Sequence, residues 1–233
     1  MKVSRNTANK IHFLLDNLVP PILRDSKWFM YIPFKLLFGK KSNIFFNFKE
    51  KAPTLSKHQF SRIYRCVDDV LIQRETDINK GCFIEIQRNI QGRSVLEVGS
   101  GRCVLSNQVS KKGYDVTAVD IFITKQIQQE FPDITFTQGN IESLPFKNNT
   151  FDTVICTHTL EHVQDLFSGI NELRRVCRKR LIIVVPKQRP YKYTFDLHIH
   201  FFPYKSSFLA FLGEGKNTCR IIGGDIFYME EME

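Results

Sequence analysis

The chain has 233 residues, which is enough for one globular core with an appended segment. Its composition, 42% hydrophobic and 24% charged, is typical of a globular protein. The longest apolar stretch, 28–38, has eleven residues and contains Pro33 and Lys35, which excludes it as a membrane-spanning helix because a span needs about 20 residues. The net charge of +9 is uneven: residues 1–57 hold eleven Lys and Arg against three Asp and Glu, and residues 58–233 hold 22 against 21. The sequence therefore predicts a basic N-terminal segment, 1–57, and a balanced domain, 58–233.

The N-terminal segment 1–57 combines this charge with apolar clusters. A short amphipathic helix is predicted over 11–18 and is ended by Pro20-Pro21. A cluster of aromatic and long aliphatic side chains follows, with Lys and Arg between them: Trp28, Phe29, Met30, Tyr31, Phe34, Leu37 and Phe38. Three interpretations stay open: an interfacial anchor on an anionic membrane surface, a lid or dimer arm over the active site, and nucleic-acid binding. Nucleic acid is the least favoured, since no zinc knuckle or aromatic RNA-binding motif is present.

The cysteines and the first residues bear on the compartment. Six cysteines are scattered without a CxxC pair, so we expect reduced thiols in a reducing compartment. The first ten residues are polar and lack the apolar core of a signal peptide. We expect a cytoplasmic protein, with 1–57 making it peripheral on the inner membrane face if that segment is an anchor.

From residue 57 onward the chain alternates between helical and strand patterns. One or two helices are predicted over 57–91, with a break near Thr76-Asp77. Strands are predicted at 95–98, 116–120, 134–138, 151–156 and 181–185, and helices near 102–112, 124–131, 163–177 and 205–212. Such alternation predicts right-handed crossovers and a parallel sheet. Near the end, Gly223-Gly224 lies between two further strands and predicts an antiparallel hairpin.

Two of the predicted strands end in a way that suits an adenosine-containing cofactor. Strand 95–98 opens into the turn Gly99-Ser100-Gly101, and about twenty residues later strand 116–120 ends in Asp120. A glycine turn lets the backbone approach a ligand closely, and an acid at the next strand's end can accept hydrogen bonds from ribose hydroxyls. This pairing predicts a cofactor site at the carboxyl edge of the sheet.

The chain resembles the class I S-adenosylmethionine-dependent methyltransferases, and within them the small-molecule group that includes ubiquinone-pathway enzymes. The motifs that carry the resemblance are VLEVGSGRC at 95–103, VTAVDI at 116–121, GNIESLPF at 139–146, FDTVICTHTLEHV at 151–163 and ELRRVCRKRLIIVVP at 172–186. The fourth motif is the most specific. The resemblance covers roughly residues 60–233 and implies an α/β fold: a doubly wound, mostly parallel seven-stranded, Rossmann-like sheet with a C-terminal antiparallel hairpin, here with an N-terminal helical extension.

The same resemblance implies S-adenosyl-L-methionine as the cofactor. The cofactor-binding residues that it indicates are Glu97, Gly99, Ser100, Gly101, Asp120, Ile121, Asn140, Ile141 and Thr157. Asp120 is expected to accept from both ribose hydroxyls, and Ile141 to offer its N–H to the adenine ring. Asn140 stands where the family usually has Asp, and its oxygen can still accept from the adenine amino group. Cys103 replaces the family's third glycine, from which we expect a modest shift and not lost binding.

Methyl transfer to a hydroxyl needs positioning and a base, and histidine is the natural base near neutral pH. His158, His198 and His200 are the candidate catalytic residues, because all three are predicted at the carboxyl edge of the sheet. In an extended chain the rings of His198 and His200 point the same way, but a metal site would need a third ligand, so no metal is predicted. The surrounding aromatic insert, from Tyr191 to Tyr204, is interpreted either as a packed lid or as a pocket for an apolar acceptor.

These observations predict an S-adenosylmethionine-dependent methyltransferase. The expected reaction is O-methylation of a small-molecule acceptor or of one linked to a lipid or glycan. The alternatives are an RNA or protein methyltransferase and, in a different class, a non-catalytic cofactor-binding or scaffold protein. The acceptor and the oligomeric state stay open at this point.

Overall fold

The computed structural model describes residues 14, 18–67, 76–213 and 215–232. They fall into two compact units: a helical unit, Met1–Asp77 with Arg189–Phe201, and a sheet unit, Ile78–Gln188 with Phe202–Glu233. Residues 58–77 and 189–201 therefore group with the N-terminal segment and not with the sheet. The helix predicted over 11–18 falls mainly on residues outside the described part.

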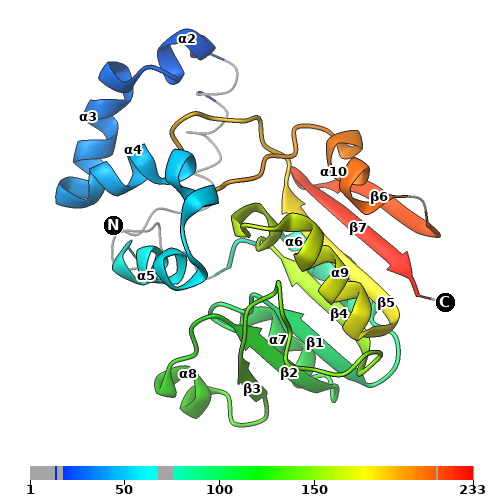
Figure 1. The fold of residues 1–233 in the computed structure, drawn as a ribbon. Helices are drawn as coiled ribbons and strands as arrows, with labels where there is room; N and C mark the ends of the chain where they lie inside the picture. The colour runs from blue at the N-terminus through cyan, green and yellow to red at the C-terminus, as the bar shows by residue number, and fades with distance from the viewer. Residues whose placement is uncertain (1–13, 15–17, 68–75, 214, 233) are drawn as a thin grey trace. The chain divides into compact units, whose positions relative to one another are not determined.

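The sheet unit is built on seven strands in the order β3-β2-β1-β4-β5-β7-β6 (Figure 1). The strands are β1 (Ser94–Val98), β2 (Asp115–Asp120), β3 (Thr135–Gln138), β4 (Phe151–Thr157), β5 (Cys177–Pro186), β6 (Asn217–Ile222) and β7 (Asp225–Glu231). The first five are parallel, and β7 runs antiparallel to both β5 and β6. The predicted fold class, with its C-terminal hairpin, is confirmed.

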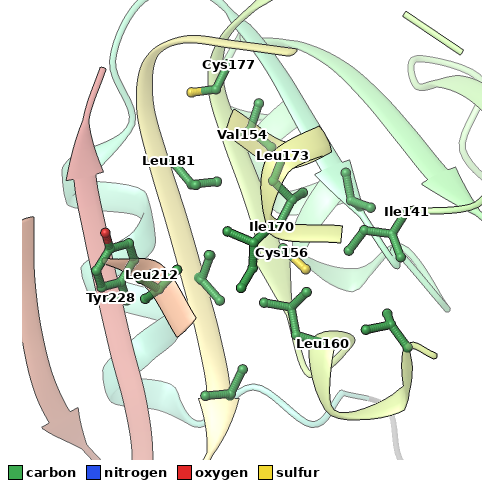
Figure 2. Packing of buried hydrophobic residues seen from close by; sticks show 14 of the residues in the cluster. Ile141, Val154, Cys156, Leu160, Ile170, Leu173, Cys177, Leu181, Leu212 and Tyr228 are labelled. Atoms are coloured by element: carbon green, nitrogen blue, oxygen red, sulfur yellow. The ribbon is translucent and has the colours of Figure 1, made fainter. Parts of the chain in front are cut away.

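Helices cover both faces of this sheet, and the strands alternate between the two layers as their period of two requires. On one face α9 (Leu166–Val176) and α10 (Lys205–Leu212) pack on Leu96, Val154 and Ile183. Figure 2 shows Val154 of this layer together with Leu173 of α9 and Leu212 of α10. On the other face α6 (Lys80–Asn89), α7 (Val104–Ser110) and α8 (Lys125–Glu130) lie against residues one step along the same strands, such as Val95, Ile155 and Ile182. The central strands are buried on both sides, so their sequences are nearly continuous runs of apolar residues.

Local capping sets where these helices begin. Asn79, Thr124 and Asp165 each accept a hydrogen bond from a backbone N–H in the first turn of α6, α8 and α9 respectively. The helix predicted over 163–177 therefore starts at Leu166, directly after its cap. The hairpin between β6 and β7 turns at Gly223 and Gly224, whose φ angles of 57° and 92° suit glycine.

Asp152, in the fourth motif, fixes the start of β4 to the start of β1. One carboxylate oxygen accepts from the N–H groups of Arg93 (2.9 Å) and Ser94 (3.2 Å), and the other accepts from Arg178 (2.6 Å). Burial alone would raise the pKa of Asp152, but Lys179, the Arg93 N–H and Arg178 outweigh burial and hold it well below the usual value. The acid of this motif thus aligns the two central strands and does not belong to the cofactor edge.

The helical unit has an aromatic core of its own. Its described helices are α2 (Pro21–Arg24), α3 (Lys27–Phe38), α4 (Ser42–Lys51) and α5 (Lys57–Val67), with two short 3-10 turns, η1 (Gly39–Lys41) and η2 (Ala52–Thr54). Phe34 on α3 packs on Phe46 of α4 (ring centroids 4.8 Å apart) and on Phe195 of the returning segment (4.6 Å). The aromatic insert Arg189–Phe201 is thus part of this core, together with α3, α4 and α5.

Among the described helices, none combines the length and hydropathy that crossing a bilayer requires. All six cysteines are free thiols.

Candidate active site

The turn after β1 lies beside the end of β2 and is held there by backbone hydrogen bonds. The N–H groups of Gly99 and Ser100 donate to the Val119 carbonyl at 2.8 and 3.1 Å. Gly99 has a φ of 75°, and a Cβ built on it would overlap the side chain of Thr159, 2.7 Å from Cγ2 and 2.9 Å from Cβ. Gly101 has a φ of 48°, but its Cβ direction faces open space. One glycine is therefore required by the protein's own packing, and the other leaves room beside the turn.

The turn ends at Cys103, which has a φ of 58° and precedes the first residue of α7. This left-handed backbone explains why glycine suits the position. Cys103 adopts the same conformation, and its buried side chain packs in the core between the sheet and α7. Burial, with smaller effects from Glu97 and Asp120, raises the pKa of the thiol to about 11, so it stays protonated and unreactive near neutral pH.

Asp120, the last residue of β2, faces this turn. One carboxylate oxygen accepts from the Gly101 N–H at 2.9 Å, and the other accepts from the Phe122 N–H at 3.1 Å. Burial raises the pKa of Asp120, while these N–H groups oppose that rise. Each oxygen keeps a lone pair, so the carboxylate is oriented and can still accept from a diol. The next residue, Ile121, is fixed through its carbonyl by the Gln138 side chain.

The bend after β3 brings Asn140 and Ile141 to the same sheet edge. The Asn140 side-chain oxygen accepts from the Glu142 N–H at 2.9 Å, so one of its two lone pairs serves the bend. The Ile141 side chain is buried between α9 and Leu160. Its backbone N–H has no hydrogen-bond partner in the described part of the chain. The Ile141 N–H, the expected donor to the adenine ring, is therefore available. The Asn140 side-chain oxygen, the expected acceptor, has one lone pair left for the adenine amino group.

Two further predicted cofactor residues have contrasting surroundings. Ser100 is buried, and its hydroxyl makes no hydrogen bond of normal geometry with the described residues. Glu97 is also buried, but its carboxylate points to the first turn of α7, where it accepts from the N–H and the hydroxyl of Ser106. Burial raises the pKa of Glu97 to about 7 against these hydrogen bonds. Glu97 thus anchors the helix behind the glycine turn, whereas Ser100 has an unused polar group in the turn itself.

The end of β4 places His158 between two acids. Thr157 is buried, and His158 follows with a φ of 49°. Its Nδ1 lies 3.6 Å from a carboxylate oxygen of Glu161, and its Nε2 lies 3.4 Å from one of Asp225, at the start of β7. Burial alone would lower the pKa of His158, but Asp225 and Glu161 outweigh it and raise the pKa to about 10. The ring is therefore an imidazolium near neutral pH and has no lone pair with which to accept a proton.

Comparison with known proteins agrees with this arrangement. Residues 96–185 match the family model described as a methyltransferase domain. Within the sheet unit, the segment 96–185 is thus similar to a methyltransferase domain. The chain is 29% identical over 117 residues to a demethylmenaquinone methyltransferase of Renibacterium salmoninarum, covering 49% of each protein. It is 34% identical over 98 residues to a ubiquinone biosynthesis O-methyltransferase of Paracidovorax citrulli, covering 38% of this chain and 41% of that protein. The matches thus span about half the length of these relatives or less.

A solved structure shows the same fold as the sheet unit. The 1,6-didemethyltoxoflavin-N1-methyltransferase of Burkholderia thailandensis, solved with its substrate and S-adenosylhomocysteine, aligns with a TM-score of 0.56. The alignment covers 75% of this chain and 86% of that one at 17% identity, so the likeness concerns the fold.

The structure separates the three candidate histidines. His158 belongs to the sheet unit, while His198 and His200 belong to the helical unit through the segment Arg189–Phe201. His198 is buried there, its N–H donates to the Thr194 hydroxyl at 3.1 Å, and its ring centroid lies 6.2 Å from that of Phe201.

Sequence reasoning missed three residues around the turn and His158. Thr159 and Glu161 lie inside the fourth motif, so the motif itself held a signal for them. Asp225 had none, because only the insertion of β7 beside β5 brings it to the end of β4. Asp225 also accepts from the Asn79 side chain at 2.7 Å, which links His158 to the cap of α6.

Proposed function

We propose that this chain is an S-adenosylmethionine-dependent methyltransferase whose cofactor lies along the carboxyl ends of β1, β2 and β3. The observation that carries the proposal is the oriented Asp120 carboxylate, 2.9 Å from the Gly101 N–H across an open glycine turn. The buried Ser100 hydroxyl and the unpaired Ile141 N–H add two unused donors along the same edge. Buried polar groups are normally paired, so these donors support a polar ligand at this place.

Different residues of this site are suited to different parts of the cofactor. Asp120 is suited to the ribose hydroxyls, the Gly99-Ser100-Gly101 turn to the methionine end, and Ile121, Asn140 and Ile141 to the adenine end. Thr157, the last residue of β4, bounds the site on that side. Glu97 accepts from the Ser106 N–H and so holds the first turn of α7 behind the glycine turn. When bound, the cofactor's sulfonium supplies an activated methyl group, so the protein's work is positioning and proton removal.

For the acceptor we propose a small molecule of the quinone-precursor class, free or lipid-linked, that is methylated on oxygen. The support is that the curated relatives include demethylmenaquinone and ubiquinone-pathway methyltransferases, one of them an O-methyltransferase. Because His158 is held as a cation between Glu161 and Asp225, we assign it the role of a positioning residue at the end of β4. The base for a hydroxyl acceptor is then sought in His198 or His200.

Isothermal titration with S-adenosylhomocysteine tests the cofactor site. Asp120→Ala removes two acceptor oxygens, and we expect affinity to fall about 30-fold or more. Asp115→Ala is the matched control, since Asp115 lies on the same strand but pairs on the surface with Arg93 at 2.9 Å. Equal affinities of the two variants would contradict the proposed site.

Turnover tests the acceptor. The protein is incubated with S-adenosylmethionine and dihydroxylated quinone precursors, RNA or peptides, and S-adenosylhomocysteine release is measured. We expect release only with the quinone precursors, and none when their hydroxyls are already methylated. Turnover on RNA or peptide would support the alternative enzyme class, and cofactor binding without any turnover would support a non-catalytic protein.

A further inference from the structure

The helical unit leaves an apolar stripe uncovered along α3. Trp28, Ile32 and Leu36 follow one another at intervals of four residues, so they share one face of the helix. Their exposed fractions are 71%, 65% and 81%, and Ile22 on α2 is 81% exposed. Of the eleven large apolar side chains that are exposed in the described part of the chain, seven lie between Leu14 and Leu36. We call Ile22, Trp28, Ile32 and Leu36 the outer stripe.

The opposite face of the same helix already has its packing partners. Met30, Phe34 and Phe38, also four residues apart, are buried against α4 and the segment Arg189–Phe201. The aromatic core of the unit is therefore complete without the outer stripe. A second apolar face on a helix that is already packed is typical of an interaction surface.

The charge around the outer stripe indicates which kind of partner binds it. Residues 26–49 contain five Lys and no Asp or Glu. Lys27 is exposed, and the Lys35 ammonium lies 5.5 Å from the ring centroid of Tyr31, close to the stripe. Asp25, between Ile22 and Trp28, already lies 3.8 Å from Arg24 and accepts from the Lys192 N–H. Two copies of this chain joined through the stripe would therefore bring the same lysines together with few acids to neutralise them. An anionic lipid surface instead offers headgroups to the lysines and an acyl boundary to the apolar side chains.

We propose that the outer stripe of α2 and α3 is a membrane-docking surface that inserts into the interface of anionic bilayers. Trp28 and Leu36 enter the acyl boundary, and Lys27 and Lys35 extend their ammonium groups to the phosphates. The helix lies in the plane of the membrane, consistent with its twelve residues. This inference stands on the helical unit alone and does not depend on the chemistry of the sheet unit.

Trp28 is the single tryptophan of the chain, so its fluorescence reports on the stripe directly. The full-length protein is titrated with vesicles of phosphatidylcholine containing 30% phosphatidylserine, and with phosphatidylcholine alone. We expect water-like emission before vesicles are added, a shift to shorter wavelength with anionic vesicles, and quenching by brominated acyl chains. Binding should weaken in 0.5 M salt, because the Debye length then falls below that at physiological ionic strength.

Paired variants locate the surface. Ile32→Ser with Leu36→Ser should weaken vesicle binding about tenfold or more, because two exposed apolar side chains no longer insert. Ile221→Ser is the matched control: Ile221 is 48% exposed but lies on β6 of the sheet unit, and the variant should bind like the unaltered protein. Circular dichroism verifies folding, and brominated-lipid quenching of the unaltered protein needs no variant at all.

Four results would overturn the inference. The first is a Trp28 spectrum that no vesicle changes, and the second is equal binding by the stripe variant. The third is short-wavelength emission before vesicles are added, which would mean that protein already covers the stripe. The fourth is a dimer that the stripe variant dissociates, seen by analytical ultracentrifugation. S-adenosylhomocysteine titration of the same preparations keeps this outcome separate from that of the proposed function.

Discussion

Gly99 and Gly101 both have positive φ angles, yet the structure predicts different consequences for replacing them. An alanine at either position meets the strain of a left-handed backbone, about 1–2 kcal/mol, offset in part by the loss of glycine's freedom in the unfolded chain. At Gly101 nothing lies within 4 Å of the added methyl group, so Gly101→Ala should lower the free energy of unfolding by about 1 kcal/mol. At Gly99 the methyl group collides with Thr159. The Thr159 Cβ is itself only 2.9 Å away, so no rotation of that side chain removes the overlap. Overpacking of this kind adds about 1–3 kcal/mol, and Gly99→Ala should therefore cost about 3 kcal/mol in total.

Urea denaturation followed by circular dichroism measures these differences, and a double-mutant cycle isolates their cause. Thr159→Gly removes the three atoms nearest to the new methyl group, so the Gly99→Ala with Thr159→Gly pair should show a favourable coupling of about 2 kcal/mol. Cofactor affinity should show the reverse order. Gly101→Ala places a methyl group in the open space beside the turn and should weaken S-adenosylhomocysteine binding about tenfold while the fold persists. If Gly99→Ala proves no more destabilising than Gly101→Ala, or if the cycle shows no coupling, the contact with Thr159 does not determine the glycine.

Two further predictions concern the histidines. The pKa of His158 in the folded protein, about 10, lies above its ordinary value of 6.5, so its pairing with Glu161 and Asp225 stabilises the fold fully below pH 6.5 and is lost as the pH rises through 10. His158→Gln should therefore lower the free energy of unfolding by about 3 kcal/mol near pH 7. The difference in stability between the variant and the unaltered protein should shrink steadily towards pH 10. A difference that does not change with pH would contradict the pairing. His198→Ala and His200→Ala test the proposed base: the variant that lacks it should lose about 10²- to 10⁴-fold in turnover at unchanged S-adenosylhomocysteine affinity. Wild-type turnover in both variants would exclude each of them as the base.

The sequence by itself determined the architecture of the sheet unit and the line of its cofactor edge. The signals that predicted this architecture are local, because each depends on only a few neighbouring residues. They are the strand and helix periodicities, the glycine turn at 99–101, Asp120 at the end of its strand and the Gly223-Gly224 hairpin. They are reliable because backbone conformation and the alternation of buried faces depend mainly on near neighbours. Helix boundaries were less accurate where a cap such as Asp165 or a left-handed residue such as Cys103 set the start.

Only the tertiary structure decided what individual side chains do. Glycine is required at position 99 because of Thr159, which lies sixty residues later in the chain. His158 is held as a cation in part by Asp225, which lies on β7 beside β5. The aromatic cluster at 28–38 is uniform as a sequence, yet packing buries Phe34 and leaves Trp28 in solvent. The segment Arg189–Phe201 follows the last parallel strand but joins the helical unit. Pattern indicates which residues are apolar or titratable; burial, pairing and pKa depend on partners that are distant in the chain, so they exist only once the chain has folded.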